Sequence, residues 1–344
     1  MIKVGLVGYG FAGRGFHSYL INRVPELKLA AVAVRSPERR AQAERDHGVA
    51  TFATVADLLA RGGVDLVVLA TPHDTHASLA IEAMSAGKHV VTDKVMCMNT
   101  READAMIEAS RRHHVLLSVF QNRRWDWDYL TVKKVLEDGL LGAPYLFEVA
   151  IMRNRPPRGW RATVEAGGGL LYDWGAHLID QALQLVPSRI ESVSCDLQYR
   201  GWGAEIGSYG RVQMRFEGGV LYDVEISNLA WADKPRWLIL GERGALVKRG
   251  LDPQEMAMLR GDIGAATEDP ANRAVICAEL NGLTTEMTVE SVRSDWTEYY
   301  RNVAASIRGE AELAVKPEEA RRAVAVFDAA MESSRTGQTI RLGV

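Results

Sequence analysis

Gly8-Tyr9-Gly10-Phe11-Ala12-Gly13 is the stretch that determines the fold class of this chain. An apolar run from Ile2 to Val7, typical of a buried parallel strand, comes before it, and a helical pattern comes after it. A second apolar run, Leu27 to Val34, then completes a strand-helix-strand unit. The spacing G-x-G-x-x-G in this context predicts a Rossmann-type dinucleotide site.

Each glycine of the stretch has a physical task in such a site. Gly8 permits the tight turn, Gly10 lets backbone N–H groups approach a pyrophosphate, and Gly13 allows close contact between helix and strand. The N-terminus of the helix, near Phe11 and Ala12, then attracts the negative charge of the pyrophosphate. A purely structural glycine turn is the alternative, which the flanking strand and helix make the weaker interpretation.

The residues after the second strand, Arg35-Ser36-Pro37-Glu38-Arg39-Arg40, bear on the choice of cofactor. Enzymes that use NAD usually carry Asp or Glu at this strand tip to bind the ribose 2′-hydroxyl, and none stands there. Arg35, Ser36 and Arg39 could instead hold a 2′-phosphate by charge-assisted hydrogen bonds. Ser36 could also act only as the N-cap of a helix that starts at Pro37. We therefore predict NADP as the cofactor, with NAD as the alternative.

Strands and helices continue to alternate up to about residue 120, with further strands expected at Val64–Ala70, His89–Thr92 and Leu116–Phe120. This alternation predicts a doubly wound parallel sheet. In such a sheet, the loops after the carboxyl ends of the strands contact the ligand. Those loops contain Thr71, Pro72, His76, Asp93, Lys94, Gln121, Asn122 and Arg124.

Lys94 is the notable charge in these loops. A lysine at a strand tip beside a nicotinamide could donate a hydrogen bond to a substrate oxygen and stabilise an alkoxide. An ordinary solvated lysine is the alternative. Asp93 could pair with Lys94 or bind the cofactor.

A second candidate site is the glycine-rich segment Gly167-Gly168-Gly169, which runs into a predicted helix. Asp173, His177 and Asp180 lie three or four residues apart on it and therefore share one helical face. A carboxylate one turn from an imidazole suits proton transfer. A capped surface helix with a hydrogen-bonded histidine is the alternative. Asp180, a turn deeper, is expected to be structural.

The pattern changes after Trp125, which indicates two domains, 1–123 for dinucleotide binding and 124–344 for substrate binding and oligomerisation. The second domain is expected to be α+β, with a large open antiparallel sheet. Its alternating segments lie near Ile190–Tyr199, Tyr209–Phe216, Val220–Leu229, Arg236–Leu240, Gly241–Leu246 and Met287–Val292.

Composition narrows the function classes. The chain has 344 residues and a formal net charge of −3, which gives no electrostatic case for nucleic acid. No run approaches the ~18 apolar residues of a membrane helix, and no signal peptide is evident. Its three cysteines have no metal-type spacing, so we expect no metal site and a reducing, cytoplasmic compartment.

Four motifs in order resemble the glucose-fructose oxidoreductase / inositol dehydrogenase / MocA (Gfo/Idh/MocA) family of NAD(P)-dependent oxidoreductases. They are Gly8–Gly13, Thr71-Pro72 with His76, Ala86–Lys94, and Gly168-Gly169 with Asp173, Gly175 and His177. Segments such as Leu117–Asp126 and Gly250–Glu255 are most similar to the NADP-dependent scyllo-inositol dehydrogenase branch. Two departures stand out: the family's Glu-Lys-Pro is Asp93-Lys94-Val95 here, and Gln121 stands where relatives often have histidine.

The resemblance implies that Lys94, Asp173 and His177 form the catalytic set, and that homodimers or homotetramers assemble through the second domain's sheet. Together with the motifs, it places the cofactor at Gly8, Gly10, Phe11, Ala12, Gly13, Arg35, Ser36, Arg39, Thr71, Pro72, His76, Asp93, Lys94, Gln121 and Arg161. It places a polyol, cyclitol or sugar substrate at Lys94, Asn122, Arg124, Trp160, Tyr172, Asp173 and His177.

Three function classes remain open from the sequence. The first is a dehydrogenase that interconverts a secondary alcohol and a ketone on a cyclitol or sugar. The second uses the bound cofactor for net non-redox chemistry, such as glycoside cleavage through a keto intermediate. The third is a cofactor-binding sensor without turnover, against which the presence of Lys94, Asp173 and His177 argues.

Overall fold

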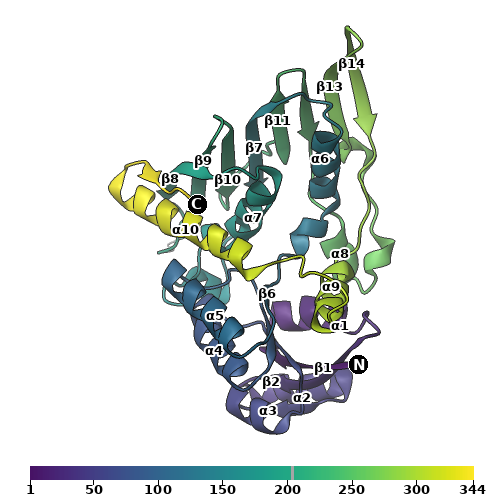
Figure 1. Cartoon of the computed structure of the whole chain (residues 1–344), viewed down its shortest axis with the longest axis vertical. Helices are drawn as coiled ribbons and strands as arrows, with labels where there is room; N and C mark the ends of the chain where they lie inside the picture. Colours follow the sequence, from purple (N-terminus) through teal and green to yellow (C-terminus); the bar gives the residue numbers. More distant parts are fainter. Residues whose placement is uncertain (203–204) are drawn as a thin grey trace. The chain divides into compact units, whose positions relative to one another are not determined.

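The structure is a computed structural model that describes residues 1–202 and 205–344 (Figure 1). The chain forms two compact units. The first unit comprises Met1–Asn122 and Trp296–Val324, and the second comprises Arg123–Asp295 and Ala325–Val344. Each unit is described by itself below.

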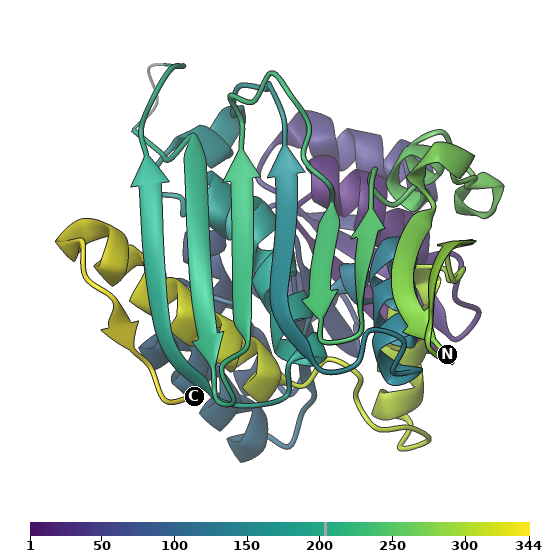
Figure 2. The ribbon, with the colours of Figure 1, turned by 90° about the horizontal axis from the view of Figure 1, so that it is seen from above.

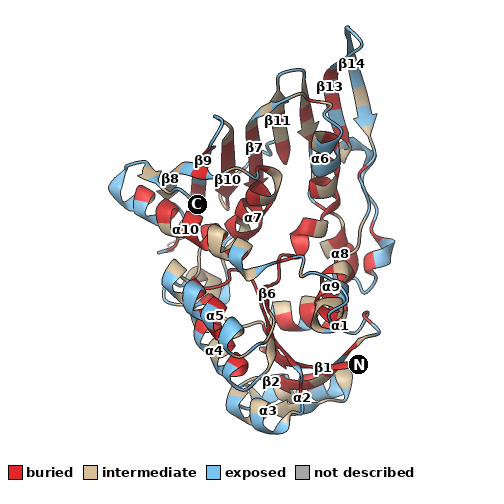
Figure 3. Ribbon diagram, viewed as in Figure 1, coloured by how far each residue is buried: buried red, intermediate tan, exposed pale blue. Residues whose placement is uncertain are grey.

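The first unit contains a six-stranded parallel sheet in the order β3-β2-β1-β4-β5-β6, which is the expected Rossmann arrangement. All four residues of β4 are buried, as they should be in a sheet covered on both faces. Figure 3 shows the buried residues of β1, in the same sheet, in red. The order reverses between β1 and β4, and ligands bind at such reversals. The strands are β1 (Ile2–Val7), β2 (Leu27–Ala33), β3 (Ala50–Phe52), β4 (Leu66–Leu69), β5 (His89–Thr92) and β6 (Leu117–Val119).

Helical segments connect these strands. The first is η1 (Gly13–His17), a π-helical turn that continues into α1 (Ser18–Ile21). The others are α2 (Pro37–His47), α3 (Val55–Arg61), η2 (His73–Thr75), α4 (His76–Ser85), α5 (Thr100–Arg112) and α9 (Thr297–Ile307), while the unit boundary falls inside α10 (Pro317–Thr336).

The structure divides the chain at 122/123, and Trp296–Val324, which the sequence analysis assigned to the second domain, returns to the first unit. The cause is aromatic packing. Trp296 is fully buried and stacks on Phe16 with ring centroids 5.9 Å apart. Tyr299 donates a hydrogen bond to Ser118 Oγ over 3.0 Å. These contacts join residues that are 280 and 181 positions apart in sequence, so no local pattern indicates them.

The second unit contains a nine-stranded sheet, drawn face-on in Figure 2, in the order β14-β13-β12-β11-β7-β10-β9-β8-β15. Its strands pair mostly antiparallel, as the sequence predicts, while β7 and β10 pair in parallel. A parallel pair needs a long crossover connection, which the helical segments after β7 supply. The strands are β7 (Pro144–Met152), β8 (Ile190–Gln198), β9 (Tyr209–Phe216), β10 (Leu221–Ser227), β11 (Trp237–Gly241), β12 (Gly244–Lys248), β13 (Ala274–Leu280), β14 (Leu283–Val289) and β15 (Ile340–Arg341).

One face of this sheet carries the core of the second unit. Alternate residues of β9 are buried, and Phe147 of β7 stacks on Tyr222 of β10 with centroids 5.1 Å apart. Eight of the ten residues of α7 are buried. The helical segments are η3 (Asn122–Trp125), α6 (Trp127–Glu137), η4 (Gly159–Ala162), η5 (Leu171–Gly175), α7 (Ala176–Leu185), α8 (Gln254–Leu259), η6 (Ile263–Ala265) and η7 (Pro270–Asn272).

Two further observations concern the described residues. None of their helices combines the length and apolar character that a membrane crossing needs. The three cysteines are free thiols: Cys97 is buried, Cys195 is half-buried and Cys277 is exposed.

Candidate functional site

The glycine turn after β1 leaves no room for side chains at two of its positions. Gly8 has a φ of +93°, and a Cβ there would lie 2.3 Å from the carbonyl oxygen of Ala70. A Cβ at Gly13 would lie 2.1 Å from the carbonyl oxygen of Gly8. The face at Gly10 is open, since the nearest atom to a Cβ there is Arg39 Nη1 at 3.4 Å. This cradle fits the pyrophosphate of a dinucleotide, which needs backbone approach at this turn.

The residues after β2 form the helix cap that the sequence predicted as one alternative, and recognition of a 2′-phosphate stays a prediction. Ser36 caps α2, because Arg39 N–H donates to Ser36 Oγ over 3.2 Å. The side chains of Arg35 and Arg39 remain exposed, and Arg39 lies beside the open face of Gly10. Ser36 Oγ also donates to the carboxylate of Glu38 and lowers its pKa. Sequence reasoning missed Glu38, which adds a negative charge to this corner.

His76 links the loops after β4 and β5. It is fully buried, with Nδ1 2.7 Å from the carbonyl oxygen of Val95 and Nε2 3.0 Å from that of Thr71. Burial lowers its pKa. In the first of these loops, Thr75 Oγ1 donates to the carbonyl oxygen of Pro72 over 2.7 Å. Because its ring nitrogens face backbone carbonyls of both loops, His76 holds these loops in place, and its part in cofactor binding stays a prediction.

Lys94 directly follows β5 and is 9% exposed, and the peptide bond from Lys94 to Val95 is cis. Asp93 accepts a hydrogen bond from Lys94 N–H over 2.8 Å and therefore fixes the backbone at the lysine. The other oxygen of Asp93 lies 3.7 Å from His17 Nε2. His17 Nδ1 in turn lies 2.7 Å from the hydroxyl of Tyr300. Sequence reasoning missed His17, whose only signal was a histidine soon after the glycine turn.

Two opposing effects set the pKa of Asp93. Burial raises it, but the nearby imidazole of His17, 3.7 Å away, together with the charges of Lys94 and His76, outweighs burial and holds it well below its usual value. Asp93 is therefore ionised at neutral pH. Gln121, at the end of β6, is also buried at 3% exposure.

Asp93→Asn is expected to destabilise the protein at pH 7 by about 1.5–3 kcal/mol, the usual value of a hydrogen bond to a charged group. Because the folded-state pKa of Asp93 lies below the ~3.9 of an unfolded aspartate, its contribution is present above that pH and is lost as the pH falls. The difference between wild type and variant should therefore narrow from pH 7 to pH 3 in urea unfolding. Asp104→Asn is the control, since Asp104 forms an exposed pair with Arg321 that contributes at most about 1 kcal/mol. If Asp93→Asn and Asp104→Asn lowered the free energy of unfolding by the same amount at every pH, this role of Asp93 would be wrong.

In the second unit, the glycine-rich turn before Asp173 is hydrogen-bonded to η4. Gly169 N–H donates to the carbonyl oxygen of Arg161 over 3.1 Å, and Gly168 N–H donates to that of Thr163 over 2.9 Å. A Cβ at Gly168 would lie 2.5 Å from the oxygen of Thr163, so only glycine fits. The segment then continues as the π-helical turn η5, and such turns are frequent at functional sites.

Asp173 lies in η5 and His177 in the first turn of α7. Arg161 Nε lies 3.5 Å from Asp173 Oδ1, and both side chains are about one-third exposed. His177 is buried at 7% exposure. The guanidinium of Arg161 lies over the ring of Trp160, 4.5 Å from its centroid. These four predicted residues therefore lie on neighbouring segments of one unit, whereas Lys94 belongs to the other.

Trp174, between Asp173 and His177 in sequence, is held by two arginines that sequence reasoning missed. Arg123 and Arg153 each place a guanidinium 4.3 Å from the centroid of its ring. Arg123 is itself fixed, because it donates to Asp126 over 3.1 Å and to Glu255 over 2.5 Å. These contacts anchor η5, the turn that carries Asp173.

The remaining predicted substrate residues are buried or half-buried. Arg124 donates two hydrogen bonds, of 2.8 and 2.7 Å, to the buried carboxylate of Asp180, so Asp180 is bound in a structural ion pair. Tyr172 packs on Phe327 with centroids 5.4 Å apart, and burial raises its pKa to about 12. Asn122 is 2% exposed, and its Nδ2 makes no hydrogen bond to any described residue. Contact of these residues with substrate remains a prediction.

Both units match known protein families. Residues 2–121 match the oxidoreductase family with an NAD-binding Rossmann fold, and residues 129–247 match the GFO/IDH/MocA C-terminal domain. The chain belongs to the Gfo/Idh/MocA family. It is therefore an NAD(P)-dependent oxidoreductase whose first unit binds a nicotinamide cofactor.

Proteins with similar sequences align with the whole chain. The scyllo-inositol 2-dehydrogenase (NADP(+)) IolW of Bacillus subtilis is 32% identical and aligns with 99% of this chain and 96% of its own. A crystal structure from Klebsiella pneumoniae is 35% identical, with a TM-score of 0.89 over 100% of this chain and 95% of that one. The WlbA dehydrogenase from Bordetella pertussis, solved with NADH and UDP-GlcNAcA, is 26% identical, with a TM-score of 0.81 over 100% of this chain and 99% of that one.

Proposed function

We propose that this Gfo/Idh/MocA oxidoreductase interconverts a secondary alcohol and a ketone on a cyclitol or sugar, with NADP(H) as cofactor. The observation that carries the proposal lies in the first unit. Lys94 follows β5 at the same carboxyl edge of the parallel sheet where the glycine turn follows β1. A buried cation at that edge suits an alkoxide next to the nicotinamide. The 32% identity to a scyllo-inositol 2-dehydrogenase supports the substrate class.

The cofactor, when bound, accepts or supplies the hydride, and the protein positions the substrate and handles the proton. In the proposed reaction, His177 exchanges the proton with the substrate hydroxyl, because imidazole suits proton transfer near neutral pH. Lys94 holds the same oxygen by a hydrogen bond. Asp173 binds a neighbouring hydroxyl, with Arg161 fixing its carboxylate.

The preference for NADP and the assembly are part of the same proposal. The exposed guanidinium groups of Arg35 and Arg39 support recognition of a 2′-phosphate. Exposed apolar side chains on β13 and β14, among them Leu280 and Leu283, support homodimers or homotetramers through the nine-stranded sheet.

The proposal is tested by incubating the enzyme with NADP+ or NAD+ and a panel of cyclitols and sugars. We expect absorbance of reduced cofactor to rise with at least one neutral polyol, and to rise faster with NADP+. Product without net absorbance change would replace this proposal by cofactor-assisted non-redox chemistry. Cofactor binding without any product across the panel would favour the sensor.

A further inference from the structure

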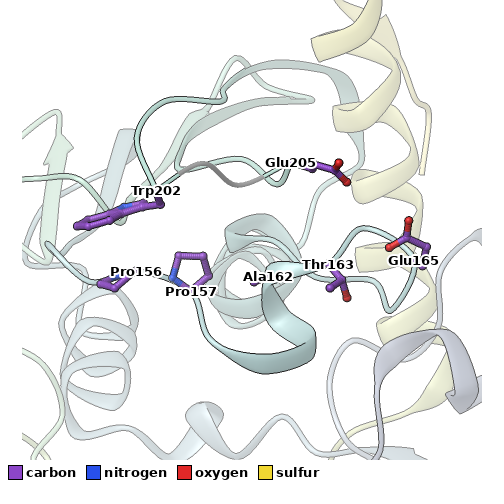
Figure 4. Close-up of a pocket in the computed structure, with 7 residues that line it drawn as sticks. All are labelled: Pro156, Pro157, Ala162, Thr163, Glu165, Trp202 and Glu205. Carbon is purple, nitrogen blue, oxygen red and sulfur yellow. The ribbon is translucent and has the colours of Figure 1, made fainter.

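The second unit has a pocket of about 420 Å³ (Figure 4). Its walls come from the segment that contains η4 and from residues between β8 and β9. The volume lies in the range of small-molecule sites, about 300–1,000 Å³. None of the residues assigned above to catalysis lines it.

The two ends of the pocket differ in chemistry. Trp202 and Pro156 stand at one end, and Glu165 and Glu205 stand at the other, on the side of Thr163 (Figure 4). Trp202 is 43% exposed, so its indole is available to an occupant. Carboxylates only accept hydrogen bonds, and Thr163 already uses its hydroxyl proton on the carbonyl oxygen of Trp160.

An occupant must therefore present an apolar face to the indole and prolines, and O–H or N–H donors to the carboxylates. A sugar or cyclitol ring does both, since C–H groups cover its faces and hydroxyls surround its edge. A lone ammonium group would satisfy the carboxylates but would leave most of the apolar wall uncovered. A carboxylate or phosphate would be repelled by both glutamates.

The pocket is connected to the candidate reaction site through η4. Ala162 and Thr163 line the pocket, and the preceding residue, Arg161, lies 3.5 Å from Asp173. The backbone oxygens of Arg161 and Thr163 also accept the hydrogen bonds from the glycine turn before Asp173. A substrate ring at Asp173 could thus carry a substituent that extends across η4 into the pocket.

We propose that this pocket binds a second sugar or cyclitol ring, so that the substrate is a glycosylated polyol rather than a single ring. The inference rests on the proposed function, because it places the reacting ring at Asp173. Trp202 stacks on the second ring, and Glu165 and Glu205 accept its hydroxyls.

The test compares matched pairs with NADP+: myo-inositol against its galactoside galactinol, and glucose against maltose. We expect kcat/KM to be about tenfold higher for the two-ring member of at least one pair, the scale that aromatic stacking supplies. Trp202→Ala should remove that preference while changing kcat/KM for the single ring less than about twofold. Trp231→Ala is the matched control, since Trp231 is 93% exposed and does not line the pocket, and it should change neither value. Glu165→Gln should lower the preference in the same direction.

Equal loss on both members of a pair in Trp202→Ala, or no preference for two rings in wild type, would overturn the inference while leaving the proposed function intact. A binding measurement tests the pocket independently of the proposed dehydrogenase activity. With NADPH present, so that no alcohol is oxidised, saturation-transfer NMR should detect galactinol or maltose on the wild type and lose the signal of the second ring in Trp202→Ala. If this binding signal were seen without turnover of any alcohol, it would support the pocket as a sugar-binding site and refute the proposed dehydrogenase activity.

Discussion

Replacing Lys94 or His177 by alanine is expected to lower turnover at least about a hundredfold, the usual scale for a group that moves or stabilises a proton in the transition state. The structure strengthens the case for Lys94, because three contacts fix its surroundings. Asp93 accepts the hydrogen bond from its backbone N–H, His17 lies beside Asp93, and His76 holds the next carbonyl. A solvated surface lysine would not need such support.

The control for Lys94 is Lys88→Ala. Lys88 directly precedes β5 and so lies at the amino end of the strand that Lys94 follows. Ligands bind at the carboxyl end of a parallel sheet, so Lys88→Ala should keep near-normal turnover. For His177, which is buried, His177→Gln accompanies the alanine variant because it preserves more of the side-chain volume. Circular dichroism and NADPH titration should show intact folding and cofactor binding in all variants. Near-normal turnover in both Lys94→Ala and His177→Ala would refute the catalytic assignment.

Arg35→Ala and Arg39→Ala are each expected to weaken NADPH binding about 10- to 100-fold and to leave NADH binding nearly unchanged. The reason is that a charge-assisted hydrogen bond to phosphate contributes about 1.5–3 kcal/mol, and only NADPH has the 2′-phosphate. Fluorescence titration with the two reduced cofactors measures the effect directly. Arg45→Ala is the matched control, because Arg45 is exposed in the last turn of the same helix, α2.

Glu38→Gln, in the same segment after β2, is expected to change NADPH binding in the opposite direction. Glu38 accepts a hydrogen bond from Ser36, and its charge opposes a 2′-phosphate nearby. Its neutral replacement should strengthen NADPH binding relative to NADH. Equal losses for both cofactors in Arg35→Ala and Arg39→Ala would show that these arginines contact the part that the cofactors share, and would refute the NADP preference.

The sequence predicted those structural features that depend on residues close to one another in the chain. The glycine turn, the strand that precedes it and the helix that follows are determined by residues within a short stretch, so their spacing predicts the Rossmann fold. The strand alternation of β8 to β10 and the glycine-rich start of the helix with Asp173 and His177 are local in the same sense. β13 was missed, although its residues alternate between buried and exposed as a half-covered strand should.

Tertiary structure decided the features that depend on residues far apart in sequence. Burial of Trp296, Tyr299 and Tyr300 brings the segment 296–324 back to the first unit, because their large apolar surfaces find partners there. The crossover through η4, η5 and α7 makes β7 parallel to β10. His17 at Asp93 and the two arginines over the ring of Trp174 are likewise contacts that no spacing encodes.

The sequence by itself thus determined the fold class, the cofactor turn and the residue types available for proton transfer, because periodicity and turn chemistry act over a few residues. Only the tertiary structure decided how those residues are held: Asp93, ionised, accepts a hydrogen bond from the backbone N–H of Lys94, Asp173 lies beside Arg161, and Arg124 is bound to Asp180. Such pairings depend on burial and distance, which the packing of distant segments sets.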